Sequence, residues 1–212
     1  MSIRIPKYTL AEELWNSISH GLAAIFAIVA TILMIVKADT ALEYVTVSIF
    51  GTAMIVLYVI SCIYHALSRR LTGKKVLRVI DHCNVFLLVL GTYTPVALLG
   101  VGGALGWWLF GFVALVSVIG ITLSAVAIDR FQILEVICHL LNGWSVLIGL
   151  PQLYEHMGLA GVLLLLLGGL AYTVGAVLYG VGAKRRYIHS VFHFFCVAGT
   201  ALHWCAIYLC LL

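Results

Sequence analysis

Long stretches without a charged residue dominate this chain and limit what it can fold into. They cover residues 14–36, 44–68, 82–128, 136–154, 156–183 and 187–212. A helix needs about 20 apolar residues to cross a bilayer, so each stretch can span a membrane and the longest can do so twice. With 64% hydrophobic and only 9% charged residues, the composition also excludes an ordinary water-soluble domain.

These stretches predict helices rather than the strands of a barrel. A membrane β-barrel shows segments of about ten residues with alternating hydrophobicity, whereas these stretches are continuously apolar. The glycine-rich sequence at 100–106 divides the longest stretch in two. The sequence therefore predicts an all-α integral membrane protein, with seven transmembrane helices in a single domain over residues 1–212. The expected helices cover 15–36, 43–67, 79–99, 106–127, 131–153, 159–182 and 187–211.

The positive charges indicate how the bundle is oriented, because Lys and Arg in short loops favour the cytoplasmic side. With a cytoplasmic N-terminus, only Lys37 lies on the opposite side. The residues on the cytoplasmic side are then Arg4, Lys7, Arg69, Arg70, Lys74, Lys75, Arg78, Arg130, Lys184, Arg185 and Arg186. We therefore expect a multi-pass protein of the cell (cytoplasmic) membrane, with its C-terminus extracytoplasmic. Because the net charge of +4 lies in short turns between membrane segments, no nucleic-acid partner is expected.

Two further patterns in the predicted helices concern packing. Pro95 and Pro151 each remove a backbone hydrogen bond and are expected to kink their helices. The predicted helix at 159–182 carries many Gly and Ala residues, which let a neighbouring backbone approach closely. We interpret this pattern as helix packing and not as a ligand site.

Ionisable residues gather at one depth of the predicted bundle. Such residues are costly in a hydrocarbon core and mark functional sites. His65, Asp81, His189 and His193 each lie three to seven residues from an Arg at the cytoplasmic end of their helices. At 1.5 Å per residue, all four lie within roughly 10 Å of the inner boundary. Three different helices thus bring these groups to the same depth.

The spacing of the histidines predicts a metal site. His189 and His193 are spaced i, i+4, so both imidazoles lie on one helix face and can chelate one ion. Ser61 and His65 repeat this spacing on another helix. Three imidazoles suit Zn²⁺ and leave its fourth position open for water, whose pKa the metal lowers to about 7. We predict His65, His189 and His193 as ligands, with Asp81 beside the water and Ser61 over the same cavity.

Each of these groups also has a structural interpretation. Pairs of histidines in membrane helices can simply hydrogen-bond across the bundle, and an isolated HxxxH pattern is common by chance. Asp81 can stabilise the start of its helix through the helix dipole, and Ser61 can serve packing alone. The shared depth of the three histidines and Asp81 favours the metal interpretation.

A second polar group lies at the start of the first helix, where Glu13, Asn16 and His20 are spaced i, i+3 and i+7 on one face. Either Glu13 or its neighbour Glu12 can cap the helix. His20 lies deeper and is expected either to support the metal ligands or to serve as a structural hydrogen-bond partner. His82 points about 100° away from Asp81 around the helix. The histidines not predicted as ligands are His82, His139, His156 and His203.

Five motifs follow one another along the chain, and together they resemble those of a known family. They are Glu13-x-x-Asn16-x-x-x-His20, Ser61-x-x-x-His65, Asp81-His82, Gly91-Thr92-Tyr93-Thr94-Pro95 and His189-x-x-x-His193. In this order they resemble the bacterial hemolysin III family, which belongs to the progestin and adipoQ receptor superfamily. The resemblance covers essentially the whole chain.

The resemblance implies a seven-helix bundle with a cytoplasmic N-terminus and a zinc ion near the inner leaflet. In related receptors, the residues that match His65, His189 and His193 hold the metal. The residue that matches Asp81 contacts the metal-bound water, and the residue that matches Ser61 is a candidate for stabilising an oxyanion. Similarity of the superfamily to alkaline ceramidases suggests amide or ester hydrolysis of a lipid.

Three functions are compatible with the sequence. The first is a zinc-dependent membrane hydrolase, with a membrane lipid as substrate. The second is a non-catalytic membrane-lipid sensor or regulator, in which a structural zinc ties helices together and a lipid is the ligand. The third, a channel-forming hemolysin, has the least support because the ionisable groups gather at one end instead of lining a channel. No cofactor other than Zn²⁺ is expected, and the sequence leaves the oligomeric state open.

Overall fold

The computed structural model of the chain describes residues 3–182 and 185–212, and Lys184 lies outside these ranges. Within them the protein is all-α, with no strand. The elements are α1 (Leu10–Lys37), α2 (Ala41–Ala66), α3 (Thr72–Pro95), the π-helical η1 (Val96–Val101), α4 (Gly103–Ala127), α5 (Gln132–Trp144), the 3₁₀-helical η2 (Ser145–Gly149), α6 (Leu150–Gly182) and α7 (Ile188–Cys210).

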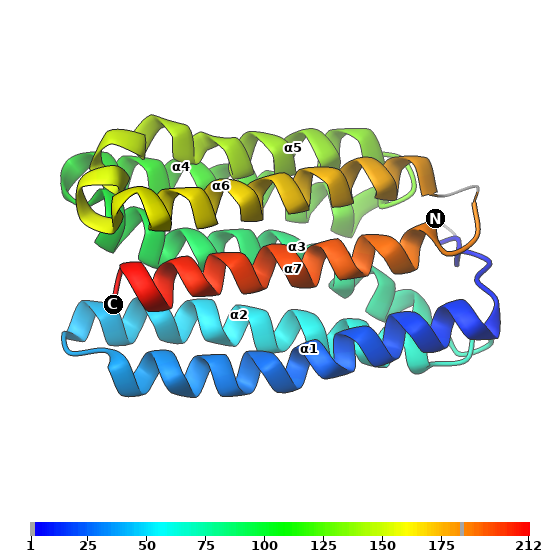
Figure 1. The fold of residues 1–212 in the computed structure, drawn as a ribbon. Helices are drawn as coiled ribbons and strands as arrows, with labels where there is room; N and C mark the ends of the chain where they lie inside the picture. The colour runs from blue at the N-terminus through cyan, green and yellow to red at the C-terminus, as the bar shows by residue number, and fades with distance from the viewer. Residues whose placement is uncertain (1–2, 183–184) are drawn as a thin grey trace.

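Six helical stretches of the described chain are long and apolar enough to cross a membrane, where the sequence predicts seven. The difference lies in the stretch Gln132–Gly180, which has 49 residues. The stretch is interrupted by a kink at Gly158, whose φ of 65° and ψ of −176° are not helical. In Figure 1 the ribbon reverses near this glycine, so that α5 and most of α6 run side by side.

Capping residues and buried charges set helix starts that differ from the predicted ones. α1 begins at Leu10 instead of residue 15, because the Thr9 side chain accepts from the Glu12 N–H while Glu12 accepts from the Thr9 N–H. α3 begins at Thr72 instead of residue 79. Its first turns contain Lys74 and Arg78, which are buried against acidic partners.

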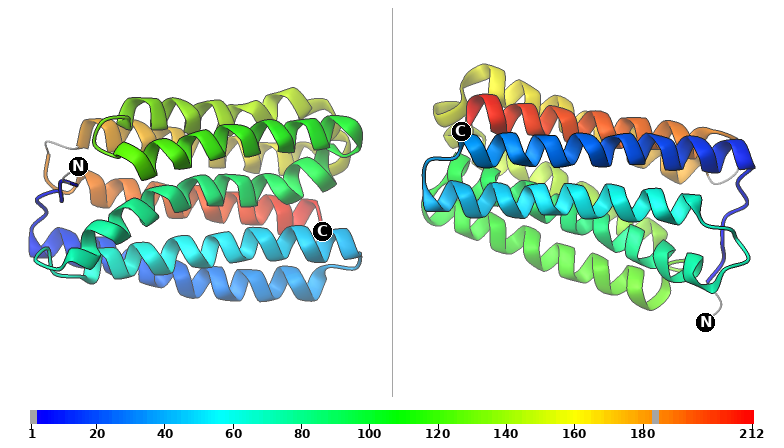
Figure 2. Two further views of the ribbon diagram at one scale, coloured as in Figure 1. Left: turned by 180° about the vertical axis from the view of Figure 1, so that it is seen from behind. Right: turned by 90° about the horizontal axis from the view of Figure 1, so that it is seen from below.

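The helices lie roughly along one axis, and each packs against the next in the chain (Figure 1). α7 packs against both α6 and α1. The two termini lie at opposite ends of this bundle, as both views in Figure 2 also show. The N-terminal segment before α1 crosses the end of the bundle where α3 and α7 begin.

Both prolines lie next to irregular helix. Each proline lacks an N–H, and the carbonyl that this N–H would have bonded accepts a hydrogen bond from another donor. Pro95 cannot bond the carbonyl of Gly91, and the Thr94 hydroxyl donates to that oxygen instead. The π-helical η1 follows directly. Pro151 cannot bond the carbonyl of Leu147, which accepts from the Leu150 N–H at the end of η2.

Gly168 of α6 packs closely against α7, as the sequence predicts for the small residues of this helix, whereas Gly169 and Gly180 have open space around them. A Cβ atom added at Gly168 would collide with the His203 ring and lie 3.1 Å from the Gly199 carbonyl oxygen. A Cβ atom added at Gly199 would lie 2.8 Å from the Tyr172 ring. At these glycines the two helices therefore approach more closely than larger residues would allow.

Candidate metal centre

Three histidines from two helices meet near the end of the bundle that the N-terminal segment crosses. One ring nitrogen from each of His65, His189 and His193 lies within 4.8 Å of the others. His65 and His193 are each only 1% exposed. The Nε2 atoms of His189 and His193 face each other at 3.2 Å, which their i, i+4 spacing on α7 permits.

Glu13 fixes the orientation of the His65 ring. Its Oε2 atom lies 2.7 Å from His65 Nδ1, and its Oε1 atom lies 2.6 Å from Lys74 Nζ. The short contact to a carboxylate assigns the proton to Nδ1, which donates to Glu13 and leaves the Nε2 lone pair free. The sequence left open whether Glu12 or Glu13 caps α1. Glu12 caps the helix together with Thr9 in a capping box, and Glu13 supports His65.

Asn16 and His20 also contact the histidine cluster. The Asn16 side chain is fully buried, and its Nδ2 atom lies 3.4 Å from His65 Nδ1. The His20 ring stacks on His193 with 3.7 Å between ring centroids and 16° between planes. His20 therefore packs against the histidine cluster from α1 without being one of its three converging members.

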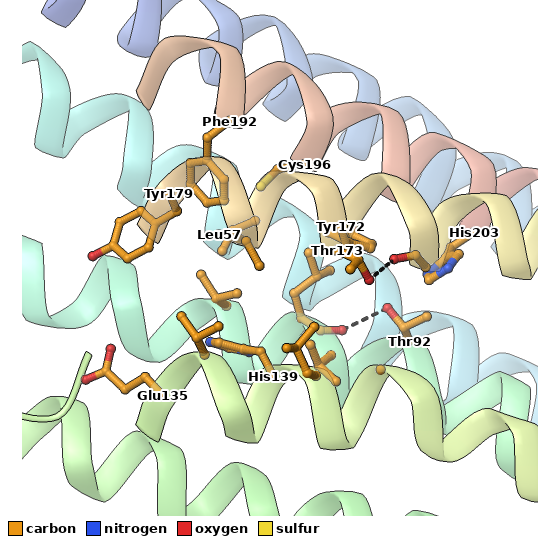
Figure 3. A pocket seen from close by; sticks show the side chains of 18 of the residues that line it. Leu57, Thr92, Glu135, His139, Tyr172, Thr173, Tyr179, Phe192, Cys196 and His203 are labelled. Carbon is orange, nitrogen blue, oxygen red and sulfur yellow. Dashed lines mark hydrogen bonds between the residues drawn. The ribbon is translucent and has the colours of Figure 1, made fainter. Parts of the chain in front are cut away.

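Ser61 and Asp81 lie on the wall of a cavity next to the histidines. The cavity has a volume of about 180 Å³, and its lining includes Ser61, Asp81, His189 and His193. Figure 3 shows that apolar and aromatic side chains form much of its wall. One partly enclosed cavity is thus lined by the predicted acid, the predicted hydroxyl and two of the three predicted imidazoles. These side chains come from α2, α3 and α7.

Tyr8 and Lys74, which no sequence pattern predicts as site residues, also belong to this centre. The Tyr8 ring stacks on His189, with 4.9 Å between ring centroids and 14° between planes, and lies 6.0 Å from the His65 ring. Burial raises the pKa of the Tyr8 hydroxyl, so this side chain stays neutral over the cluster. Lys74, which is fully buried, holds the second oxygen of Glu13.

Hydrogen bonds with charged side chains hold in place the N-terminal segment that carries Tyr8. Arg78 Nη1 donates to the Arg4 carbonyl oxygen at 2.7 Å and to Asp129 Oδ1 at 2.8 Å. The Arg4 N–H donates to Asp129 Oδ2 at 2.9 Å. Partial burial alone would raise the pKa of Asp129, but the Arg4 N–H and the Arg78 guanidinium outweigh it and lower this pKa from its usual value.

Three histidines that are not predicted as ligands also line the cavity. Two of them, His139 and the His82 predicted to point away from Asp81, contribute to the same wall, together with Glu135. The Glu135-x-x-x-His139 spacing was a visible signal, since residues four apart share a helix face. His203 also lines this cavity, and its Nε2 atom lies 3.0 Å from the Leu165 carbonyl oxygen.

The donor set fits a zinc ion. His65 Nε2 is buried without a hydrogen-bond partner in the described part of the chain, and the two other Nε2 atoms face each other. Two neutral imidazoles in this arrangement can share at most one proton between facing nitrogens. A cation bound to all three nitrogens would satisfy every lone pair, and imidazole ligands suit zinc.

Comparisons with known proteins place the chain in one family. Residues 8–204 match the family model described as Haemolysin-III related. The chain is 33% identical to "Hemolysin-3 homolog" of Bacillus subtilis (strain 168) over 207 residues, which covers 96% of each protein. It is also 33% identical to "Hemolysin-3" of Bacillus cereus over 194 residues, which covers 90% of this chain and 88% of that protein.

A more distant similarity extends to animals. The human "Monocyte to macrophage differentiation factor" is 24% identical over 209 residues, which covers 95% of this chain and 85% of the human protein. The similarity confirms the family that the five sequence motifs resemble. Because the family model spans nearly the whole length and the helices are long and apolar, the chain is a multi-pass membrane protein of the haemolysin-III related family.

Proposed function

We propose that this protein binds Zn²⁺ through His65, His189 and His193 and hydrolyses an amide or ester bond of a membrane lipid. One observation carries the proposal: three imidazole nitrogens converge within 4.8 Å beside a cavity that Asp81 and Ser61 also line. When bound, zinc supplies Lewis acidity, which lowers the pKa of water and polarises a carbonyl oxygen.

The remaining chemistry belongs to side chains of the protein. Asp81 lies on the cavity wall and can accept a proton at a carboxylate oxygen, as a general base does. Ser61, one helical turn from His65, can donate its hydroxyl hydrogen to an oxygen that gains negative charge. Glu13 holds His65 in one tautomer, and Asn16 and His20 pack around the ligands. The apolar part of the wall suits the chain of a lipid.

We further propose a single domain with seven membrane crossings and a cytoplasmic N-terminus. Two observations support an odd number of crossings. The termini lie at opposite ends of the bundle, and the stretch Gln132–Gly180 reverses near Gly158. Its 49 residues would extend roughly 74 Å as one straight helix, more than twice the roughly 30 Å of a bilayer core. The basic residues at the end with the N-terminus support its cytoplasmic location.

A hydrolysis assay on zinc-loaded protein tests the catalytic part of this proposal. Purified protein in detergent is incubated with ceramides, phospholipids and acyl-amides, and products are quantified by mass spectrometry. We expect one lipid class to be cleaved, and Asp81→Asn to lower the rate by about 10²- to 10⁴-fold because it removes the general base. Glu155→Gln, at an exposed position, serves as the control and should leave the rate unchanged. If every lipid stays intact at full zinc occupancy, the protein is not a hydrolase of these lipids.

A further inference from the structure

A second polar group lines the cavity on the wall formed by α3 and α5. Glu135 and His139 lie one turn apart on α5, and His82 comes from α3. Glu135 Oε2 is 3.4 Å from His82 Nδ1. All three residues line the cavity beside the histidine centre, and none of them has a role in the proposed hydrolysis.

Glu135 is buried with half of its hydrogen-bonding capacity unused. The residue is 4% exposed, and its Oε1 atom has no partner within residues 3–182 and 185–212. The Nδ1 atom of His139, also buried, lacks a partner in the same ranges. A buried carboxylate oxygen without a donor is costly, so this wall is suited to a ligand that supplies donors.

The two buried cations near this end of the bundle are engaged elsewhere. Lys74 pairs with Glu13, and Arg78 pairs with Asp129. Among the described residues, His82 is the one ion-pair partner of Glu135, at the long distance of 3.4 Å. Within residues 3–182 and 185–212, no Lys or Arg thus lies within ion-pair distance of Glu135, and a bound cation can supply that charge.

The shape of the cavity indicates what kind of cation would fit. Its lining on α3 and the first residue of η1 extends from Asp81 to Val96, which is roughly 22 Å at 1.5 Å per helical residue. Figure 3 shows Glu135 and Tyr179 at one end, and Thr92 and His203 toward the other. In the described chain, only His65, His189 and His193 bring three metal-ligating atoms within 4.8 Å, so a metal ion suits the Glu135 group less well than an organic cation with hydrogen-bond donors.

We propose that Glu135, together with His82 and His139, binds the protonated amine of a single-chain amphiphile whose alkyl chain lies along the cavity. An ammonium group has three N–H donors, enough for both Glu135 Oε1 and the Nδ1 atom of His139, which lack partners among the described residues. The ion pair replaces an unsatisfied carboxylate oxygen with a charge-assisted hydrogen bond. The inference depends on the cavity and not on hydrolysis, so it stands or falls separately from the proposed activity.

Binding of matched probes to the full-length protein tests this inference. Dodecylamine and dodecanol have the same chain and differ in the charge of the head, and their dissociation constants can be measured by titration calorimetry in a nonionic detergent. We expect dodecylamine to bind about ten-fold more tightly than dodecanol, since charge-assisted hydrogen bonds are about twice as strong as neutral ones. Glu135→Gln should abolish this preference, whereas Glu155→Gln, which removes an exposed charge, should retain it.

Equal binding of the two probes by the unaltered protein would overturn the proposal, and so would a preference that survives Glu135→Gln. If Glu135→Gln does not fold, labelling provides an independent test. Dodecylamine with a photoreactive group beside the amine should label cavity-lining residues of α3 or α5, such as Val85 or Val136. Labelling confined to outward-facing Ile133, which is 80% exposed, would contradict the proposed site.

Discussion

At the scale of single residues, Glu13 connects a buried lysine on α3 to a histidine of the proposed metal centre. One of its oxygens holds His65 and the other holds a fully buried lysine. The spacing Thr9-x-x-Glu12 is that of a capping box and was readable in the sequence. This spacing makes Glu12 the partner of Thr9 in the capping box. Glu13, about 100° further around the helix, is then free to face the histidines.

Glu13→Gln is expected to weaken zinc binding while leaving the protein folded. The amide keeps the size of the side chain but removes the carboxylate that orients His65, a change that typically costs 10- to 100-fold in metal affinity. Competition with a chromophoric zinc chelator measures the affinity. Glu43→Gln removes the same charge in the capping box of α2, at the other end of that helix, and should leave the affinity unchanged. Equal effects of the two variants would contradict the role of Glu13.

Asp129 controls how firmly the N-terminal segment is held over the centre. Its pKa in the folded protein is lowered, so the stabilisation is present above the ordinary value of 3.8 and is lost as the pH falls through the folded pKa. Asp129→Asn reproduces that loss at neutral pH. We expect the Arg4 amide to exchange its hydrogen about ten-fold faster in this variant, because it loses a charge-assisted hydrogen bond.

Hydrogen exchange at pH 7, followed by mass spectrometry, measures how fast the Arg4 amide exchanges in each variant. Asp39→Asn, an exposed change in the loop between α1 and α2, is the matched control and should leave exchange at Arg4 as it is. Unchanged exchange in Asp129→Asn would show that other contacts hold the segment.

At the scale of elements, the packing of α4 depends on a glycine next to the irregular η1 segment. A Cβ atom at Gly106 would collide with the backbone carbonyl oxygen of Ala97, which cannot move as a side chain can. Gly106→Ala should therefore lower the stability by about 1–3 kcal/mol, the usual cost of overpacking. Gly111→Ala, on the same helix with open space around it, should not destabilise the protein. Thermal unfolding in detergent compares them, and equal melting temperatures would contradict this packing.

Hydropathy predicts the existence of these helices well but not all of their ends. The starts of α1 and α3 lie five and seven residues earlier than predicted, since caps and buried ion pairs extend a helix beyond its apolar part. The sequence does predict that His65, His189 and His193 lie at the same depth, because the distance of each residue from a charged cytoplasmic loop can be counted along its helix. Tyr8 escaped prediction because it reaches the centre through the path of the N-terminal segment, which no periodic pattern encodes. Lys74 escaped prediction because α3 begins seven residues before its predicted start, and the extra turns bring this lysine to Glu13.

At the scale of the whole molecule, the proposed seven crossings put the termini on opposite sides of the membrane. Alkaline phosphatase fused to a protein becomes active only when exported, because its disulfides need an oxidising compartment. In a bacterial host, we expect a fusion after Leu212 to be active and a fusion after Arg70 to be inactive. A fusion after Gly158 should also be active, because the chain reverses there. An inactive C-terminal fusion together with an active Arg70 fusion would invert the proposed orientation, and inactivity of both would indicate an even number of crossings.

The central claim is that three histidines from α2 and α7 hold one metal ion, and metal analysis tests it most directly. The full-length protein is purified in detergent, loaded with zinc, freed of loosely bound metal and analysed by mass spectrometry beside His193→Ala and Asp81→Asn. We expect about one zinc per chain in the unaltered protein and in Asp81→Asn, and loss of that zinc in His193→Ala. Absence of zinc from the unaltered protein, or a zinc content that His193→Ala leaves unchanged, would contradict the account.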